Sequence, residues 1–112
     1  FNGDISNWNV SNVKDMEHMF QNSIFTGDLS KWDVSNVRSM GSMFATSKFN
    51  GDISNWDTSN VEDMDYMFFC SKFTGDVSKW DVSKVKYMNR AFDELLTKAP
   101  NWYGGWTVKS DI

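Results

Sequence analysis

The chain has 112 residues, of which 40% are apolar and 23% charged, the composition of one globular domain rather than two. Fifteen acidic and eleven basic residues give a net charge of −4, which argues against nucleic acid as a partner because phosphate recognition needs a basic surface. One cysteine and one histidine exclude an internal disulfide framework and a Cys/His zinc site, so no metal or cofactor is expected. No apolar run approaches the roughly 20 residues of a membrane-spanning helix, so no membrane insertion is expected.

A gapless 24-residue repeat occupies most of the chain. Each copy opens with a phenylalanine, and a tryptophan, a methionine and a second phenylalanine follow at fixed positions. The chain divides into repeats 1–24, 25–48, 49–72 and 73–96 and a C-terminal cap or tail at 97–112. A fixed period of this length is typical of a solenoid, in which each unit buries its apolar face against its neighbours.

The first part of each repeat predicts a turn followed by a strand. In the first copy Gly3 is expected to adopt a positive φ, and Asp4 to accept a backbone N–H two residues on. Ile5, Trp8 and Val10 then alternate with polar residues, so Trp8 and Val10 would share one face of a short strand. Parallel pairing of these strands would stack the tryptophans of successive repeats.

The second part of each repeat predicts a short helix. Ser11 is a suitable N-cap, and Val13, Met16, Met19 and Phe20 follow at the spacing of one helix face. The expected fold class is therefore an α/β repeat, a solenoid of four 24-residue coils in which each coil contributes a short parallel strand and a short helix.

The two ends of the array differ. After Pro100, the aromatic residues Trp102, Tyr103 and Trp106 are expected to cover the apolar end of the last coil, as the terminal cap of a solenoid must. The alternative is an aromatic platform that stacks on sugar rings. No equivalent device precedes Phe1, so the N-terminal face is expected to be uncapped, with self-association through it or coverage by a partner.

Polar residues of the predicted strands would form a solvent-facing grid. These candidate ligand-binding residues are Asn7, Asn9, Lys31, Asp33, Asn55, Asp57, Lys79 and Asp81. Repeat proteins often bind through such a face, but a grid of small polar residues can also serve only to keep a sheet soluble.

A column of aspartates, one in each repeat, raises a second hypothesis. Its members are Asp4, Asp28, Asp52 and Asp76. Stacked carboxylates suit a calcium ion, whereas an aspartate after glycine is typical of a turn that binds its own backbone. The turn is the favoured interpretation, and no metal site is predicted.

The repeat resembles a known family. Trp32 to Val37 read Trp-Asp-Val-Ser-Asn-Val, and Met40, Met43 and Phe44 follow as Met-x-x-Met-Phe. This pattern is similar to that of the BspA-like leucine-rich-repeat surface proteins over residues 1–96. The resemblance implies a leucine-rich-repeat-like solenoid at the cell surface or secreted, with adhesion to matrix proteins or cells, and it implies no catalytic residues.

The expected function is a non-enzymatic, adhesion-type module that holds an extracellular protein ligand, of the matrix or a cell surface, across the polar grid. A structural spacer or stalk is the first alternative, and a carbohydrate-binding module that uses the C-terminal aromatics is the second. No nucleophile, base and orienting group converge anywhere in the pattern, so we expect no enzymatic activity.

Overall fold

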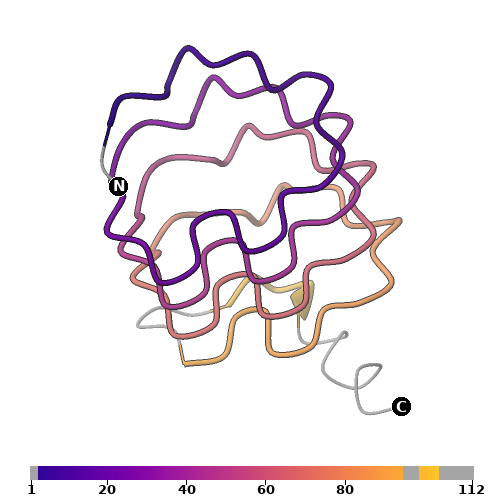
Figure 1. Ribbon diagram of the computed structural model, residues 1–112. Coiled ribbons are helices and arrows are strands. Elements are labelled where there is room, and N and C mark those ends of the chain that lie inside the picture. The colour runs from indigo at the N-terminus through magenta and orange to yellow at the C-terminus, as the bar shows by residue number, and fades with distance from the viewer. Residues whose placement is uncertain (1–2, 95–98, 104–112) are drawn as a thin grey trace.

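Four coils stacked on one another form the body of the molecule (Figure 1). The computed structural model describes residues 3–94 and 99–103. Coils 1 to 4 comprise residues 3–24, 25–48, 49–72 and 73–94, and backbone segments 24 residues apart run side by side (Figure 1). Among these residues only Tyr103 is helical. The only extended pairing within residues 3–94 and 99–103 is a row of isolated parallel bridges, Asp15 to Ser39, Ser39 to Asp63 and Asp63 to Tyr87.

The predicted α/β architecture is wrong. The part of the chain that the structure describes contains almost no helix (1%) and almost no strand (4%), so neither a strand-and-helix solenoid nor a leucine-rich-repeat solenoid describes this molecule. Each coil is instead built from consecutive turns. The described residues also contain no helix that is long and apolar enough to cross a membrane.

Two β-turns occupy the segment predicted as a strand. The N–H of Trp8 donates to the carbonyl of Ile5 at 3.1 Å, and the N–H of Val13 donates to Val10 at 3.0 Å. Hydrogen bonds from residue i+3 to residue i define β-turns rather than strands. The same bonds recur in the later coils, for example from Trp56 to Ile53 at 3.1 Å. The apolar residues therefore mark the corners of turns and do not alternate along an extended chain.

Turns also replace the predicted helix. The N–H of Met19 donates to Met16 at 3.3 Å, and the N–H of Ser23 donates to Phe20 at 3.1 Å. The third residue of each of these turns has a positive φ, which a right-handed helix cannot contain. The residues with positive φ are His18, Asn22, Ser42, Thr46, Tyr66, Cys70, Arg90 and Glu94, two in each coil. Ser11 is consequently not an N-cap, since its own N–H and hydroxyl donate to Asn9.

The segment predicted as a helix is the one that joins successive coils by backbone hydrogen bonds. Coil 1 donates to coil 2 through the bonds Met16 to Ser39, His18 to Gly41, Phe20 to Met43 and Asn22 to Ala45, all at 2.9 Å. The equivalent bonds link coil 2 to coil 3 and coil 3 to coil 4. In all of them the N–H groups point to the following coil and the carbonyls to the preceding one. Other backbone bonds run the opposite way, for example from Arg38 to Lys14 at 2.8 Å and from Lys48 to Ser23 at 3.1 Å, so successive coils are joined in both directions.

Aromatic side chains fill the interior of the coils. Phe20, Phe44, Phe68 and Phe92 stack with ring centroids 5.7, 5.6 and 5.3 Å apart. The phenylalanines that open coils 2, 3 and 4 form a second stack with spacings of 6.4 and 6.5 Å. Offset stacking at these distances adds to the stabilisation from burial. Met40, Met43, Met64 and Met67 are fully buried in coils 2 and 3.

The repeated tryptophans tie each coil to the one before it. Trp32, Trp56 and Trp80 are each 4% exposed, and their indole Nε1–H groups donate to Ile5, Leu29 and Ile53 of the preceding coil, each at 3.0 Å. Trp56 and Trp80 stack as predicted, with centroids 6.3 Å apart. The indole thus combines apolar burial with a satisfied buried donor.

The glycines that open the repeats do not have the predicted positive φ, since no glycine described in the structure does. Gly27, Gly51 and Gly75 are required because the ring of the phenylalanine two residues earlier lies against each of them. A Cβ atom would lie 2.6 Å from the Phe25 ring at Gly27 and 2.8 Å from the Phe49 ring at Gly51. The repeat needs glycine at this position for space and not for backbone freedom.

Relief of the positive φ gives a testable prediction. Arg90 has a φ of 52°, and this region costs an L-residue roughly 1–2 kcal/mol, so Arg90→Gly should stabilise the fold by about 0.5–1 kcal/mol after the entropic cost of glycine. Arg38 is also exposed and does not have a positive φ, so Arg38→Gly should destabilise by a similar amount. Urea denaturation of both variants measures the change in the free energy of unfolding. A loss of stability in Arg90→Gly would show that the positive φ of Arg90 does not strain the backbone.

Candidate interaction surfaces

Two columns of aspartate or asparagine hold the outer turns of every coil. In the first column Asp4, Asp28, Asp52 and Asp76 each accept the N–H of the serine two residues on, at 2.8–3.0 Å. In the second column Asn9, Asp33, Asp57 and Asp81 do the same at 3.0–3.1 Å. The turn interpretation of the first column is confirmed by these bonds. The described residues contain no group of three or more His, Cys, Asp or Glu placed to hold a metal ion.

All eight residues of the predicted grid are exposed. They are Asn7, Asn9, Lys31, Asp33, Asn55, Asp57, Lys79 and Asp81. They project from turns and not from a sheet, and half of them also hold the fold through the second column. This structural role was not predicted from the sequence, although the same spacing, aspartate or asparagine followed two residues later by serine, marks both columns.

The first column and the grid together form an acidic strip. We define the strip as the residues of the two columns plus Asn7, Lys31, Asn55 and Lys79. Seven aspartates less two lysines give the strip a charge of −5, against −4 for the whole chain. Lys31 and Lys79 lie close enough to Asp28 and Asp76 to lower their pKa values. The remaining charge is unbalanced within the strip.

Serine hydrogen bonds lower the pKa of most carboxyl groups in the strip. Hydrogen bonds from the hydroxyl and the N–H of the serine two residues on lower the pKa values of Asp28, Asp33, Asp52, Asp76 and Asp81. The N–H and hydroxyl of Ser6 lower the pKa of Asp4. The folded pKa values are therefore below the unfolded value of about 3.9, and these groups stabilise the fold above about pH 4. That stabilisation is lost as the pH falls through the folded values.

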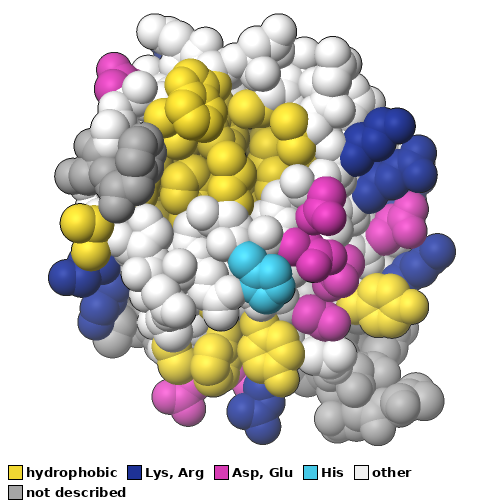
Figure 2. All heavy atoms as spheres, viewed as in Figure 1, with side chains coloured by type: hydrophobic (Ala, Val, Ile, Leu, Met, Phe, Trp, Pro, Cys, Tyr) yellow, Lys and Arg dark blue, Asp and Glu magenta, His cyan; other side chains and the backbone are white. Residues whose placement is uncertain are grey.

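A separate acidic cluster opposes folding at neutral pH. Burial raises the pKa of Asp63, and the nearby charges of Asp65, Glu17 and Asp15 raise it further, although the N–H of Asp65 lowers it in part. Figure 2 shows acidic side chains gathered beside the histidine. Since the folded pKa is raised, the charge of Asp63 destabilises the fold above that pKa, and the penalty disappears as the pH falls through it.

Neutralising Asp63 should therefore stabilise the protein at pH 7. An asparagine can still accept the Asp65 N–H, which Asp63 Oδ1 accepts at 2.9 Å, so we expect Asp63→Asn to raise the melting temperature through a gain below about 1 kcal/mol. Asp52→Asn, where the pKa is lowered, should have the opposite sign. Thermal unfolding at pH 7 and pH 3.5 tests both, and an Asp63→Asn variant less stable than the parent at pH 7 would exclude this role.

The C-terminal aromatics that the structure describes lie against coil 4. Trp102 donates its indole Nε1–H to Val77 at 3.3 Å, as the repeat tryptophans do to the preceding coil. Tyr103 is buried, packs on Phe92 with centroids 5.0 Å apart and donates its hydroxyl to Asp93 at 3.1 Å. Burial and this hydrogen bond raise the pKa of Tyr103 to about 12. Trp106 lies outside the described residues.

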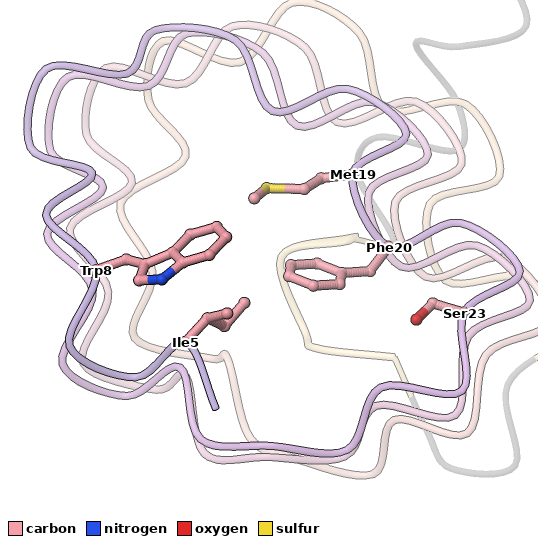
Figure 3. A pocket seen from close by; sticks show the side chains of 5 residues that line it. All are labelled: Ile5, Trp8, Met19, Phe20 and Ser23. Atoms are coloured by element: carbon pink, nitrogen blue, oxygen red, sulfur yellow. The ribbon is translucent and has the colours of Figure 1, made fainter. Parts of the chain in front are cut away.

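The opposite end of the stack presents an open apolar face. We call it the N-terminal face and define it by Ile5, Trp8, Met19, Phe20 and Ser23, which line a shallow pocket of about 260 Å³. Figure 3 shows the side chains of Ile5, Trp8, Met19 and Phe20 pointing toward the middle of coil 1. Trp8 is 55% exposed and Met19 39%, whereas Trp32 is 4% exposed. Figure 2 shows hydrophobic side chains gathered where coil 1 faces the viewer.

The chain matches the family described as "Mycoplasma protein of unknown function, DUF285" over residues 1–106, and it therefore belongs to that family. No curated protein and no solved structure matches the chain.

Proposed function

We propose that this member of the DUF285 family is a non-enzymatic protein-binding module of a cell-surface or secreted protein, and that it holds a ligand with a basic surface along the acidic strip. The resemblance of the repeat to BspA-like surface proteins is part of the same proposal. The observation that carries it is the charge of −5 on the strip, which exceeds the net charge of the whole chain. Complementary charge of this kind raises association rates and excludes partners of the wrong sign.

The rigidity of the strip supports the proposal. Its aspartate side chains accept hydrogen bonds from the serine two residues on. For example, the N–H of Ser35 donates to Asp33 at 3.0 Å and the N–H of Ser59 donates to Asp57 at 3.0 Å. A ligand that binds there has less side-chain freedom to remove, and this lowers the entropic cost of association. The low pKa values of Asp33 and Asp81 also keep these groups charged to acidic pH.

Coil 1 has an asparagine in the second column, and this suggests a variant that removes charge from the other coils and keeps their turns. Asn9 occupies the second column in coil 1 and accepts the Ser11 N–H at 3.1 Å, as Asp33, Asp57 and Asp81 do in the other coils. The triple variant Asp33→Asn, Asp57→Asn and Asp81→Asn should keep every turn while it changes the strip from −5 to −2. Substitution by lysine would break these turns and confuse loss of binding with loss of fold.

The experiment is a pull-down from solubilised extracellular-matrix and plasma proteins with the parent chain, the triple variant and Asp63→Asn as a control outside the strip. We expect a basic protein to be retained by the parent and the control, released by added salt, and lost by the triple variant with an unchanged circular dichroism spectrum. If nothing is retained, or if the triple variant retains it equally, the proposal fails and a spacer or stalk becomes the better interpretation.

A further inference from the structure

Two exposed tyrosines lie on the side of coils 3 and 4, outside the acidic strip. Tyr66 is 41% exposed and Tyr87 55%, and Figure 2 shows hydrophobic side chains on both sides of the lower end of the acidic group beside the histidine. The fold needs neither ring, because coils 1 and 2 make the same backbone hydrogen bonds with polar residues at these positions. These residues are His18 and Ser42 at the position of Tyr66, and Asp15 and Ser39 at the position of Tyr87.

Backbone pairing between coils 3 and 4 sets the two tyrosines around a pair of polar residues. The N–H of Met64 donates to the carbonyl of Tyr87, and the N–H of Tyr66 donates to the carbonyl of Asn89, both at 2.8 Å. The N–H of Asn89 in turn donates to the carboxylate of Asp65 at 2.7 Å. Paired segments lie about 5 Å apart, and residues two apart in an extended chain lie about 7 Å apart. We call this small area the tyrosine patch and define it by Tyr66, Tyr87, Asp65 and Asn89.

The tyrosine patch combines aromatic rings with hydrogen-bonding groups that are not used by the fold. The rings of Tyr66 and Phe69 form a T-shaped pair with centroids 5.5 Å apart, and this contact restrains the Tyr66 ring. The side-chain amide of Asn89 has no hydrogen-bond partner within the described residues. An amide both donates and accepts, and a carboxylate such as that of Asp65 accepts only. The patch therefore offers apolar faces, a donor and acceptors side by side.

From these groups we infer that the tyrosine patch binds a neutral saccharide, with a sugar ring packed on a tyrosine ring and the sugar hydroxyls hydrogen-bonded to Asp65 and Asn89. A sugar ring has the matching combination of groups. Its C–H face packs on the negative face of an aromatic ring, and its hydroxyls both donate and accept hydrogen bonds. The inference concerns a different surface from the acidic strip and does not rest on the proposed function.

The charge around the patch selects a neutral ligand over an anionic one. The carboxylates of Asp65, Glu17 and Asp15 lie close enough to Asp63 to act on its charge, and together these four outweigh the cation of Arg90 at the edge of the patch. Like charges repel, so sialylated and sulfated sugars are disfavoured.

Backbone pairing disfavours a peptide that would add as a strand. Such a peptide needs free backbone groups on the surface that receives it. In coil 3 the N–H groups of Met64, Tyr66 and Phe68 already donate to coil 4. The carbonyls of Asp63 and Asp65 already accept from coil 2. The side chains of the patch are therefore what remains to hold a ligand.

Coil 2 has serine at both tyrosine positions, and this suggests a variant that removes the rings and keeps the backbone. The double variant Tyr66→Ser and Tyr87→Ser places in coils 3 and 4 the residues that Ser42 and Ser39 already are in coil 2. Ile24→Lys is the control, since Ile24 is 56% exposed and lysine occupies its position in coils 2 and 3. It removes an exposed apolar side chain outside the patch.

Binding is measured by saturation-transfer difference NMR with neutral oligosaccharides of hexose and N-acetylhexosamine, and with sialylated and sulfated oligosaccharides. We expect a neutral oligosaccharide to bind the parent and the Ile24→Lys control, and the anionic ones not to bind. The double variant should bind the same oligosaccharide about tenfold or more weakly, as truncation of an anchoring tyrosine does, with an unchanged circular dichroism spectrum.

The inference is overturned if no neutral oligosaccharide binds, or if only the sialylated or sulfated ones do. It is also overturned if the double variant binds as well as the parent, because the sugar would then lie elsewhere, for example on the C-terminal aromatics. A second variant, Asn89→Asp, carries the residue that coil 3 has at this position and removes the amide donor. It should also weaken binding, and unchanged binding would contradict the inference.

Discussion

Replacing Trp56 by alanine is expected to lower the free energy of unfolding by about 3–5 kcal/mol, the range for removal of a buried aromatic side chain. Trp56 is 4% exposed, stacks on Trp80 and lies against Phe44 with centroids 6.2 Å apart. Its indole is also the donor to Leu29 at 3.0 Å, so the variant leaves that carbonyl without its partner. The loss falls on the contact between coils 2 and 3, and not on a single coil.

The matched control is Trp8→Ala at the same repeat position. Trp8 is 55% exposed and its indole has no acceptor among the described residues, so this change should cost about 1 kcal/mol or less. Guanidinium denaturation of the two variants gives both values. Equal losses would mean that the tryptophans do not act by joining one coil to the coil before it.

A methyl group added at Gly51 is expected to destabilise the fold by about 1–3 kcal/mol, the cost of overpacking a well-filled core. The new Cβ would lie 2.8 Å from the Phe49 ring and 3.4 Å from the carbonyl of Gly27. The ring has no room to move away, because Phe49 is fully buried and stacks on Phe44 at 4.6 Å and on Phe73 at 6.5 Å. Thermal unfolding of Gly51→Ala measures the effect.

Gly41→Ala provides the control for this substitution. Gly41 is also buried, but the nearest atoms to an added Cβ are 3.6 Å away, on Asp63 and Glu17, which is ordinary van der Waals contact. Because Gly41 does not have a positive φ, alanine should be neutral or stabilise by up to about 1 kcal/mol through the unfolded state. If Gly51→Ala is as well tolerated as Gly41→Ala, the glycine has another role.

The stacking of the chain and its core could be predicted from the sequence, but the local backbone could not. Val13, Met16 and Met19 are spaced by three residues, and this spacing suits one face of a helix as well as the corners of successive β-turns. The two are distinguished by backbone geometry at His18 and Asn22, where φ is 61° and 60°. Varied residues occupy these positions in the four repeats, and Asn22 is the one asparagine among the eight residues with positive φ, so no repeated glycine or asparagine marked the left-handed conformation.

Some features of the candidate surfaces could be predicted from the sequence and others could not. The exposure of Lys31 and Asp57 followed from the repeat, because a periodic pattern locates outward positions. The acidic cluster around Asp63 did not, since Glu17 and Asp63 approach only through stacking of coils two repeats apart.

The feature that most distinguishes this fold from a helical solenoid is that Met16, His18, Phe20 and Asn22, and their equivalents in coils 2 and 3, donate their backbone N–H groups to the next coil and not along a helix. The most direct test is the scalar coupling that NMR detects across a hydrogen bond between an amide nitrogen and a carbonyl carbon. The structure predicts a coupling from the nitrogen of Phe44 to the carbonyl of Met67, which are joined at 2.8 Å. A coupling from Phe44 to the carbonyl of Met40, four residues earlier as in an α-helix, would contradict it.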